Sequence, residues 1–413
     1  MSAKQWKRLD VSNRLMRGEL SVVDGAAVLG LSERWTRHLR DAVAAKGVKA
    51  VIHGNTGKRP ANRIPEKIRR QIIKLRRKLY KDFNDHHFTE KLVEVEKFKL
   101  SRPSVRRLLR EAGVEATRKR RPRKHRQRRE RKPMAGLMIL WDGSPHAWLE
   151  NRGPSLCMMG AVDDATSELL PGAHFVAQEC AASYLRVLRD IVREKGVPQS
   201  AYMDKHGSLK RNDSHWTREE ELRGEQDPTQ VARALKALEI EIIYAHSPQA
   251  KGRVERGWGT HQDRLCSELR LAKASKLGES NRILEWYRLD HNRRFAIAPQ
   301  DSTSAWRPLP RGMDLDRVCS FFYESTVGND NTVRIGGVII DIPPGPGDRG
   351  YARAKVEVRQ LLDGSWRVYH KDVLIATAAA TKSDDVRPLQ RRKRSAASRV
   401  FRRGVTQSSV SLS

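Results

Sequence analysis

Residues 247–268 read SPQAKGRVERGWGTHQDRLCSE, and this stretch determines the fold predicted for the chain. Pro248 fits the first turn of a helix, and no later proline interrupts the segment. Largely apolar side chains recur at helical spacing and predict one buried stripe, formed by Val254, Trp258, His261, Leu265 and Leu269. At about 100° per residue, Glu255, Lys251 and Gln262 lie within roughly 40° of one another beside this stripe. A carboxylate there can reach a cleft, although Glu255 taken alone is more simply a solvated helix charge.

Two apolar runs earlier in the chain each lead to a single carboxylate. Residues 137–141 lead to Asp142, and residues 201–203 lead to Asp204. Both runs predict buried strands, with Asp142 ending the first of them. Three carboxylates brought together would repel one another unless a cation lay among them. Oxygen ligands suit Mg²⁺ or Mn²⁺, so Asp142, Asp204 and Glu255 are predicted to form a metal site.

The order of these acids and their strand and helix context resemble the DDE catalytic core of transposases and retroviral integrases. The most specific part is AHSPQAKGRVER, residues 245–256. Within that class the chain most resembles insertion-sequence transposases of the ISNCY group, over about residues 9 to 309. The resemblance implies a ribonuclease H-like α/β core with a mixed five-stranded sheet, in which the two aspartate strands are neighbours. It also implies that Asp142, Asp204 and Glu255 are the catalytic residues.

The activity implied by this resemblance is that of a DNA transposase. The three acids would hold two Mg²⁺ (or Mn²⁺) ions, cleave DNA by hydrolysis at the terminal repeats of an insertion sequence, and join the 3′ ends to target DNA. Two ends must be processed together, so a homodimer or higher oligomer on double-stranded DNA is expected. Two alternatives stay open: a catalytically inactive, transposase-derived DNA-binding regulator, and a ribonuclease H-like nuclease.

Composition favours a polyanionic partner. The 413 residues carry a formal net charge of +32, which is extreme for an enzyme of small molecules and points to nucleic acid. No signal peptide or membrane-length apolar run is present, so we expect a cytoplasmic, nucleoid-associated bacterial protein without a membrane partner. The four cysteines lack C-x-x-C spacing and predict reduced packing thiols, with no structural zinc.

Two helical DNA-binding domains are expected before the catalytic core. The first spans residues 1–50: a short helix over 9–18 precedes a helix-turn-helix in which Ser21 and Ser32 cap helices and Gly30 forms the turn. An ordinary three-helix bundle with a charged face is the alternative. The second domain spans residues 60–115, with helices over 88–95 and 101–111. The predicted DNA contacts in the two domains are Arg34, Arg37, Arg40, Arg106, Arg107 and Arg110.

A basic linker, residues 116–133, joins these domains to the core. It has eleven Lys or Arg between positions 118 and 132 against one acid, Glu130, and is predicted to be disordered until it meets DNA. Its first basic residues, Arg118, Arg120 and Arg121, are predicted phosphate contacts. Lys251 and Arg253, within about one turn of Glu255, are predicted to contact phosphate as well.

The catalytic core is expected over residues 134–310. Strands are predicted over 156–162, 169–176 and 240–245, and helices over 180–195 and 229–238. Polar residues 205–227 are predicted to form an inserted surface loop. With this insertion, Asp204 and Glu255 are separated by 51 positions in the sequence. Asp163 and Asp164 are better explained by turn chemistry than by metal binding. A small β-barrel over 315–382 and a disordered basic tail over 383–413 complete the chain.

Overall fold

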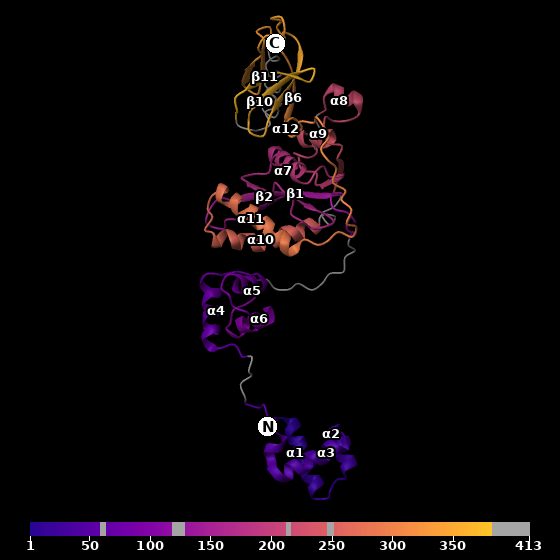
Figure 1. Ribbon diagram of the computed structural model, residues 1–413, viewed down its shortest axis with the longest axis vertical. Coiled ribbons are helices and arrows are strands. Elements are labelled where there is room, and N and C mark those ends of the chain that lie inside the picture. Colours follow the sequence, from indigo (N-terminus) through magenta and orange to yellow (C-terminus); the bar gives the residue numbers. More distant parts are fainter. Residues whose placement is uncertain (58–62, 118–128, 212–215, 246–251, 382–413) are drawn as a thin grey trace, which may run out of the picture. The chain divides into compact units, whose positions relative to one another are not determined.

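The computed structural model describes residues 1–57, 63–117, 129–211, 216–245 and 252–381 (Figure 1). For residues 219 and 252–255 only the backbone is described. The chain divides into two compact units, Met1–Ile72 and Ile73–Ser413. Within the described ranges, no helix combines the length and apolar character needed to cross a membrane.

The first unit is built from short helices whose ends are fixed by local sequence. They are α1 (Ala3–Met16), α2 (Val22–Leu29), α3 (Glu33–Lys46) and the 3-10 helix η1 (Gly47–Val51). The Ser21 and Ser32 side chains accept hydrogen bonds from the backbone N–H groups of Asp24 and Trp35, and Gly30 ends α2 with φ near +63°. These predicted caps and the turn are confirmed. The first helix begins earlier than expected because Ser2 and Gln5 form a capping box.

The second unit starts with a helical region. Helix α4 (Glu66–Lys78) runs across the division between the units and is followed by α5 (Asp85–Glu94) and α6 (Arg102–Glu111). Buried side chains within Ile73–Ser413 that hold this region include Tyr80, Phe83, Phe88, Leu92, Val105 and Leu109. Both predicted helices after residue 85 are therefore confirmed, with ends shifted by a few residues.

A five-stranded mixed sheet forms the centre of the second unit. Its strands are β1 (Ile139–His146), β2 (Leu156–Asp163), β3 (His174–Val176), β4 (Ser200–Met203) and β5 (Glu241–Tyr244). The order is β3-β2-β1-β4-β5, with β1, β2 and β3 antiparallel and β1, β4 and β5 parallel. Asp142 was expected at the end of its strand, and this is wrong, because pairing with β2 continues to His146 opposite Leu156.

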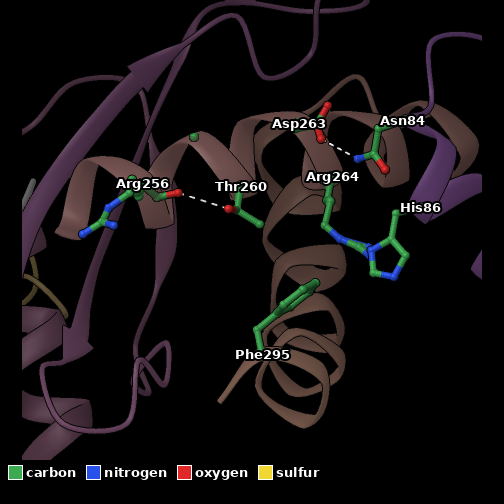
Figure 2. A pocket seen from close by; sticks show the side chains of 8 residues that line it. Asn84, His86, Arg256, Thr260, Asp263, Arg264 and Phe295 are labelled. Carbon is green, nitrogen blue, oxygen red and sulfur yellow. Dashed lines mark hydrogen bonds between the residues drawn. The ribbon is translucent and has the colours of Figure 1, made fainter. Parts of the chain in front are cut away.

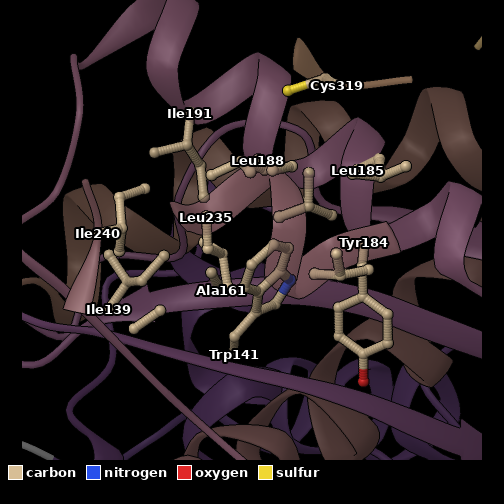
Figure 3. Packing of buried hydrophobic residues seen from close by; sticks show 14 of the residues in the cluster. Ile139, Trp141, Ala161, Tyr184, Leu185, Leu188, Ile191, Leu235, Ile240 and Cys319 are labelled. Carbon is tan, nitrogen blue, oxygen red and sulfur yellow. The ribbon is translucent and has the colours of Figure 1, made fainter. Parts of the chain in front are cut away.

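Helices cover both faces of this sheet. Helices α7 (Ala181–Glu194) and α9 (Gln230–Ala237) pack on one face, and α10 (Gly252–Leu271) and α11 (Leu277–Phe295) pack on the other (Figure 1). Figure 3 shows the first face, where Trp141 lies among Tyr184, Leu188 and Leu235. Side chains alternate along β1, so Leu140 joins the α10 face while Trp141 joins the α7 face. Asp142 follows this alternation onto the α10 side.

Two segments of the core differ from expectation. Strand β3 is shorter than predicted, because Pro171 and Gly172 make a turn and Leu169 forms only an isolated bridge with Val162. The inserted residues were predicted as a surface loop, but they contain helix α8 (Arg218–Arg223). Its Glu220 is fully buried, closes a capping box with Thr217 and pairs with Arg211. The insertion therefore has its own packed anchor.

The C-terminal region is rich in β-structure, as predicted. After the short helix α12 (Leu315–Val318) come β6 (Phe321–Thr326), β7 (Thr332–Ile335), β8 (Val338–Asp341), β9 (Lys355–Gln360), β10 (Trp366–His370) and β11 (Val373–Ala378). They form a four-stranded sheet, β11-β10-β9-β6, and a β7–β8 hairpin that share one core around Val358 and Trp366. Closure into a barrel stays a prediction.

Helix α5 docks on the outer side of α10 through buried ionic contacts. The Glu268 carboxylate of α10 lies 2.6 Å from His87 Nε2 and 2.8 Å from Lys91 Nζ. One turn earlier, Arg264 pairs with Glu90 of α5. All of these side chains are buried or nearly so, which ties the helical region to the central α/β region at α10.

Two histidines in the α10–α11 interface make the core sensitive to acid. His261 and His291 are buried, with ring centroids 4.3 Å apart. Burial, followed by the charge of Arg264, lowers the pKa of His291 to about 4, and burial lowers the pKa of His261 well below its usual value. Below about pH 6.5 the unfolded chain therefore binds more protons than the folded chain, and stability falls with pH.

We expect the variant His291→Gln to lose less stability on acidification. A folded pKa of about 4 against about 6.5 unfolded corresponds to roughly 2 kcal/mol between pH 7.5 and pH 5. Denaturant unfolding of both proteins at the two pH values measures this difference. An equal loss in wild type and variant would contradict the assignment of a neutral, buried His291.

Candidate active site

Asp142 lies on β1, and Asp204 directly follows the neighbouring parallel strand β4. The β1–β4 register pairs Ile139 with Ala201 and Leu140 with Tyr202, an offset of 62 residues. The same offset relates Asp142 to Asp204. Adjacent strands are about 4.8 Å apart, so continuing this register brings the two aspartates side by side. The expectation that their strands are neighbours is confirmed.

Helix α10 lies against this pair through two polar side chains. Trp258 Nε1 donates a hydrogen bond of 3.3 Å to Asp142 Oδ2, and Gln262 Nε2 donates one of 3.2 Å to Ser144 Oγ. The Trp258 ring also covers Gly160, which is opposite Asp142 on β2; a Cβ added at Gly160 would lie 3.3 Å from the ring. The glycine therefore makes room for the helix to approach Asp142.

The predicted buried stripe of α10 is confirmed where side chains are described. Trp258, His261, Leu265 and Leu269 are all buried. Position 255 belongs to the first turns of the same helix, three residues before Trp258, and residues at this spacing are neighbours on a helix surface. The side chains of Val254, Glu255 and Arg253, and the whole of Lys251, lie outside the described part of the chain.

A third acid, Glu179, contacts residues close to both aspartates in sequence, namely Gly143 and His206, and was not identified from the sequence. It precedes α7, and its Oε1 accepts a hydrogen bond from the Tyr184 hydroxyl and lies 3.3 Å from His206 Nδ1. The backbone N–H of His206 in turn donates to Asp204 Oδ1 at 2.9 Å. An acid before a helix has an ordinary explanation in the helix dipole, so nothing local distinguishes Glu179.

Carboxylates surround the site, and burial together with their negative charge raises the pKa values of two neighbouring groups. Burial raises the pKa of Cys157 to about 12, with the Glu179 charge adding to the effect. Burial also raises the pKa of Tyr184, and the carboxylates of Glu179, Asp204 and Asp142 raise it further. Both groups therefore stay neutral at physiological pH, and the negative charge comes from the carboxylates.

The donor chemistry fits a hard divalent cation. Carboxylate oxygens from two strands suit Mg²⁺ or Mn²⁺. Among the described side chains, no group of three or more His, Cys, Asp or Glu is arranged to hold a metal. Asp142 and Asp204 would supply two of the ligands such a site needs. A third would have to come from a residue such as Glu255, whose side chain is not described.

Asp163 and Asp164 act in the turn, as the favoured interpretation predicted. Asp163 is buried and accepts hydrogen bonds from the backbone N–H groups of Gly136 and Thr166. Asp164 accepts a hydrogen bond from the backbone N–H of Lys132 and pairs with Arg129. These bonds account for both carboxylates without a metal.

The predicted DNA-contacting arginines fall into three groups. Arg34, Arg37, Arg106 and Arg107 are exposed on α3 and α6, with Arg37 also paired to Glu33 on its own helix. Arg40 pairs with Asp41, and Arg110 points inward to Asp85 and the carbonyl of Val114. Arg118, Arg120 and Arg121 lie outside the described residues, as does the side chain of Arg253.

The cavity on the far side of α10 is separate from the acids. It measures about 420 Å³ and is lined by residues of α10, the start of α5 and Phe295 (Figure 2). Arg256, Arg264 and His86 give it a basic lining, and Asp263 accepts a hydrogen bond from Asn84 within it. Neither Asp142 nor Asp204 lines this cavity, so it is distinct from the aspartate site.

Fold and site together define a mixed α/β protein in which Asp142 on the central strand β1 contacts helix α10, and Asp204 directly follows the neighbouring parallel strand β4. A transposase named y4bF from Sinorhizobium fredii (strain NBRC 101917 / NGR234) is 33% identical over 391 residues, 92% of this chain and 84% of that protein. The transposase for insertion sequence IS1202 of Streptococcus pneumoniae is 28% identical over 94% of this chain and 90% of that protein. The chain belongs to the family of insertion-sequence transposases.

Two other comparisons add little. No family model matches the sequence. The intasome of simian T-cell lymphotropic virus, solved in complex with PP2A regulatory subunit B56 gamma, aligns with 75% of this chain and 99% of its own. Its identity is 12% and its TM-score 0.31, and so low a score supports no conclusion about fold or function.

Proposed function

We propose that this transposase cleaves DNA at the terminal repeats of an insertion sequence and joins the freed 3′ ends to target DNA. The observation that carries the proposal is the level placement of Asp142 and Asp204, with Trp258 of α10 bonded to Asp142. Membership of the transposase family supports the same reaction. The β3-β2-β1-β4-β5 order, with its antiparallel and parallel halves, supports a ribonuclease H-like core.

Asp142, Asp204 and Glu255 are the proposed catalytic residues. They would hold two Mg²⁺ or Mn²⁺ ions, which supply Lewis-acid activation of water and stabilisation of a leaving 3′ oxygen. Trp258 orients Asp142 by donating to one carboxylate oxygen, and the His206 N–H does the same for Asp204. Glu255 is assigned with them because its position in α10 is three residues before Trp258, which contacts Asp142.

The helical regions are proposed to bind the terminal repeats. Arg34, Arg37, Arg106 and Arg107 are exposed on helices and are the leading candidates, whereas the inward ion pair of Arg110 gives it a structural role that competes with DNA contact. The net charge of +32 supports binding to the phosphate backbone. Two ends must be joined together, so the active form is proposed to be a dimer or higher oligomer on DNA.

The variant Glu255→Gln tests the assignment. We expect cleavage of labelled duplexes carrying the terminal repeats to fall by roughly 10³-fold or more, because one member of a catalytic unit is removed. Affinity for the same duplexes should change by less than about two-fold, because DNA recognition is assigned to other residues. Gel assays with Mg²⁺ measure cleavage, and the same assays without metal measure binding.

Glu241→Gln is the matched control. Glu241 is exposed at the start of β5, opposite Ser200, and so lies at the other end of the strands from Asp204. The Glu241→Gln variant should cleave DNA at the wild-type rate. Cleavage by Glu255→Gln at the rate of this control would remove Glu255 from the site.

A further inference from the structure

Glu179 connects the parts of the site that carry the two aspartates. Its carboxylate accepts a hydrogen bond from Tyr184 on the first turns of α7, and lies 3.3 Å from His206 in the loop after β4. Its other oxygen lies against the backbone next to Asp142, since a Cβ built on Gly143 would be 2.6 Å from Oε2. One side chain thus touches α7, β1 and the segment that follows β4.

The contact with Gly143 explains why a glycine follows Asp142. A Cβ at position 143 would force the Glu179 carboxylate to move, and it would lie 3.2 Å from Cys157 Sγ, which is tighter than an ordinary contact. Gly143 has no positive φ, so the requirement is for space and not for backbone conformation. Glycine at position 143 leaves this space open next to Asp142, the proposed cation ligand on the same strand.

Tyr184 holds Glu179 in place from the buried side. The tyrosine is fully buried, packs edge-on against Trp141 at 5.2 Å between ring centroids, and donates its hydroxyl hydrogen to Oε1. Glu179 itself is one-fifth exposed at its side chain. The carboxylate fixed by Tyr184 therefore faces the more exposed side chain of His206.

The path from Glu179 to Asp204 runs through His206. The His206 ring lies against Glu179, with Nδ1 3.3 Å from Oε1, and this Nδ1 also accepts a hydrogen bond from the backbone N–H of Ser208 at 3.4 Å. The backbone N–H of His206 donates to Asp204 Oδ1 at 2.9 Å. Fixing the ring fixes the loop, and fixing the loop directs the N–H at the aspartate. Groups that orient metal-binding carboxylates typically change metal affinity or activity 10- to 100-fold when they are removed.

We propose that Glu179 is a positioning residue that fixes Asp204 for cation binding by anchoring the loop after β4 through His206. This inference rests on the proposed function, because it gives Asp204 the role of a cation ligand. It adds a residue outside the acid trio and assigns Glu179 no direct part in the chemistry.

Mn²⁺ binding to the full-length chain tests the inference independently of activity. Titration followed by electron paramagnetic resonance should give Glu179→Gln a Mn²⁺ dissociation constant about 10- to 100-fold above wild type. His206→Ala should give a similar shift, and its 43% exposed side chain makes loss of folding an inadequate explanation. DNA-end affinity should stay within about two-fold, and cleavage by Glu179→Gln should recover at high Mn²⁺ concentration.

Two reference variants separate the possible failures. Glu194→Gln changes an exposed acid at the far end of α7 and should bind Mn²⁺ as wild type does. Asp142→Asn should lose Mn²⁺ binding. Wild-type Mn²⁺ affinity in both Glu179→Gln and His206→Ala, with binding lost in Asp142→Asn, would overturn the role of Glu179 alone. Wild-type affinity in Asp142→Asn would overturn the proposed function and this inference with it.

Discussion

Asp142→Asn is expected to abolish end cleavage, with a rate loss of roughly 10³-fold or more. The asparagine has the same shape and can still accept the hydrogen bond from Trp258, so the packing of α10 on β1 should be kept. What it loses is the negative charge that a divalent cation requires of its ligand. Cleavage of labelled terminal-repeat DNA in Mg²⁺, with binding measured in parallel, gives the result.

The control for this variant is Asp341→Asn. Asp341 is an exposed strand aspartate on β8 in the C-terminal region and carries the same change of charge away from the sheet of the core. The Asp341→Asn variant should cleave DNA at the wild-type rate. Cleavage by Asp142→Asn within about ten-fold of this control would contradict a metal-binding role for Asp142.

Glu268→Gln is expected to lower the free energy of unfolding of the second unit by about 3 kcal/mol. Burial disfavours the Glu268 charge, but hydrogen bonds from His87 and Lys91 outweigh it and lower the pKa of the carboxyl. Removing that charge leaves the Lys91 ammonium, 13% exposed, without its anionic partner. Denaturant unfolding at pH 7 measures the change, and hydrogen exchange should show the amides of α5 exchanging faster.

Glu285→Gln provides the matched control for the buried pair. Glu285 pairs with Arg288 on α11, but its side chain is 56% exposed, and exposed pairs contribute less than about 1 kcal/mol. A loss in Glu268→Gln no larger than in this control would mean that the ionic contacts do not hold α5 on α10.

Features set by nearby residues could be predicted from the sequence. The caps at Ser21 and Ser32 and the glycine turn at Gly30 depend on three or four neighbouring positions, and the structure has them as expected. The buried stripe of α10 follows from helical periodicity and is confirmed at Trp258 and Leu265. The strand directly before Asp204 was also predictable, because its apolar run is short and leads to a carboxylate.

Features set by distant contacts could not be predicted in this way. The offset that pairs Asp142 with Asp204 depends on strand register, which no local pattern specifies. Glu220 reads as a solvated charge in a polar insertion, yet Arg211 and the Thr217 cap allow it to be buried. Glu179 is recognisable as part of the site only when β1, α7 and the loop after β4 are brought together.

The most direct test of the central claim is a crystal structure of the full-length chain with Mn²⁺, in which anomalous scattering locates the ions. We expect Mn²⁺ ligated by carboxylate oxygens of Asp142, Asp204 and Glu255 at roughly 2.2 Å. Ions bound elsewhere, with Glu255 more than about 10 Å from both aspartates, would contradict a shared cation site.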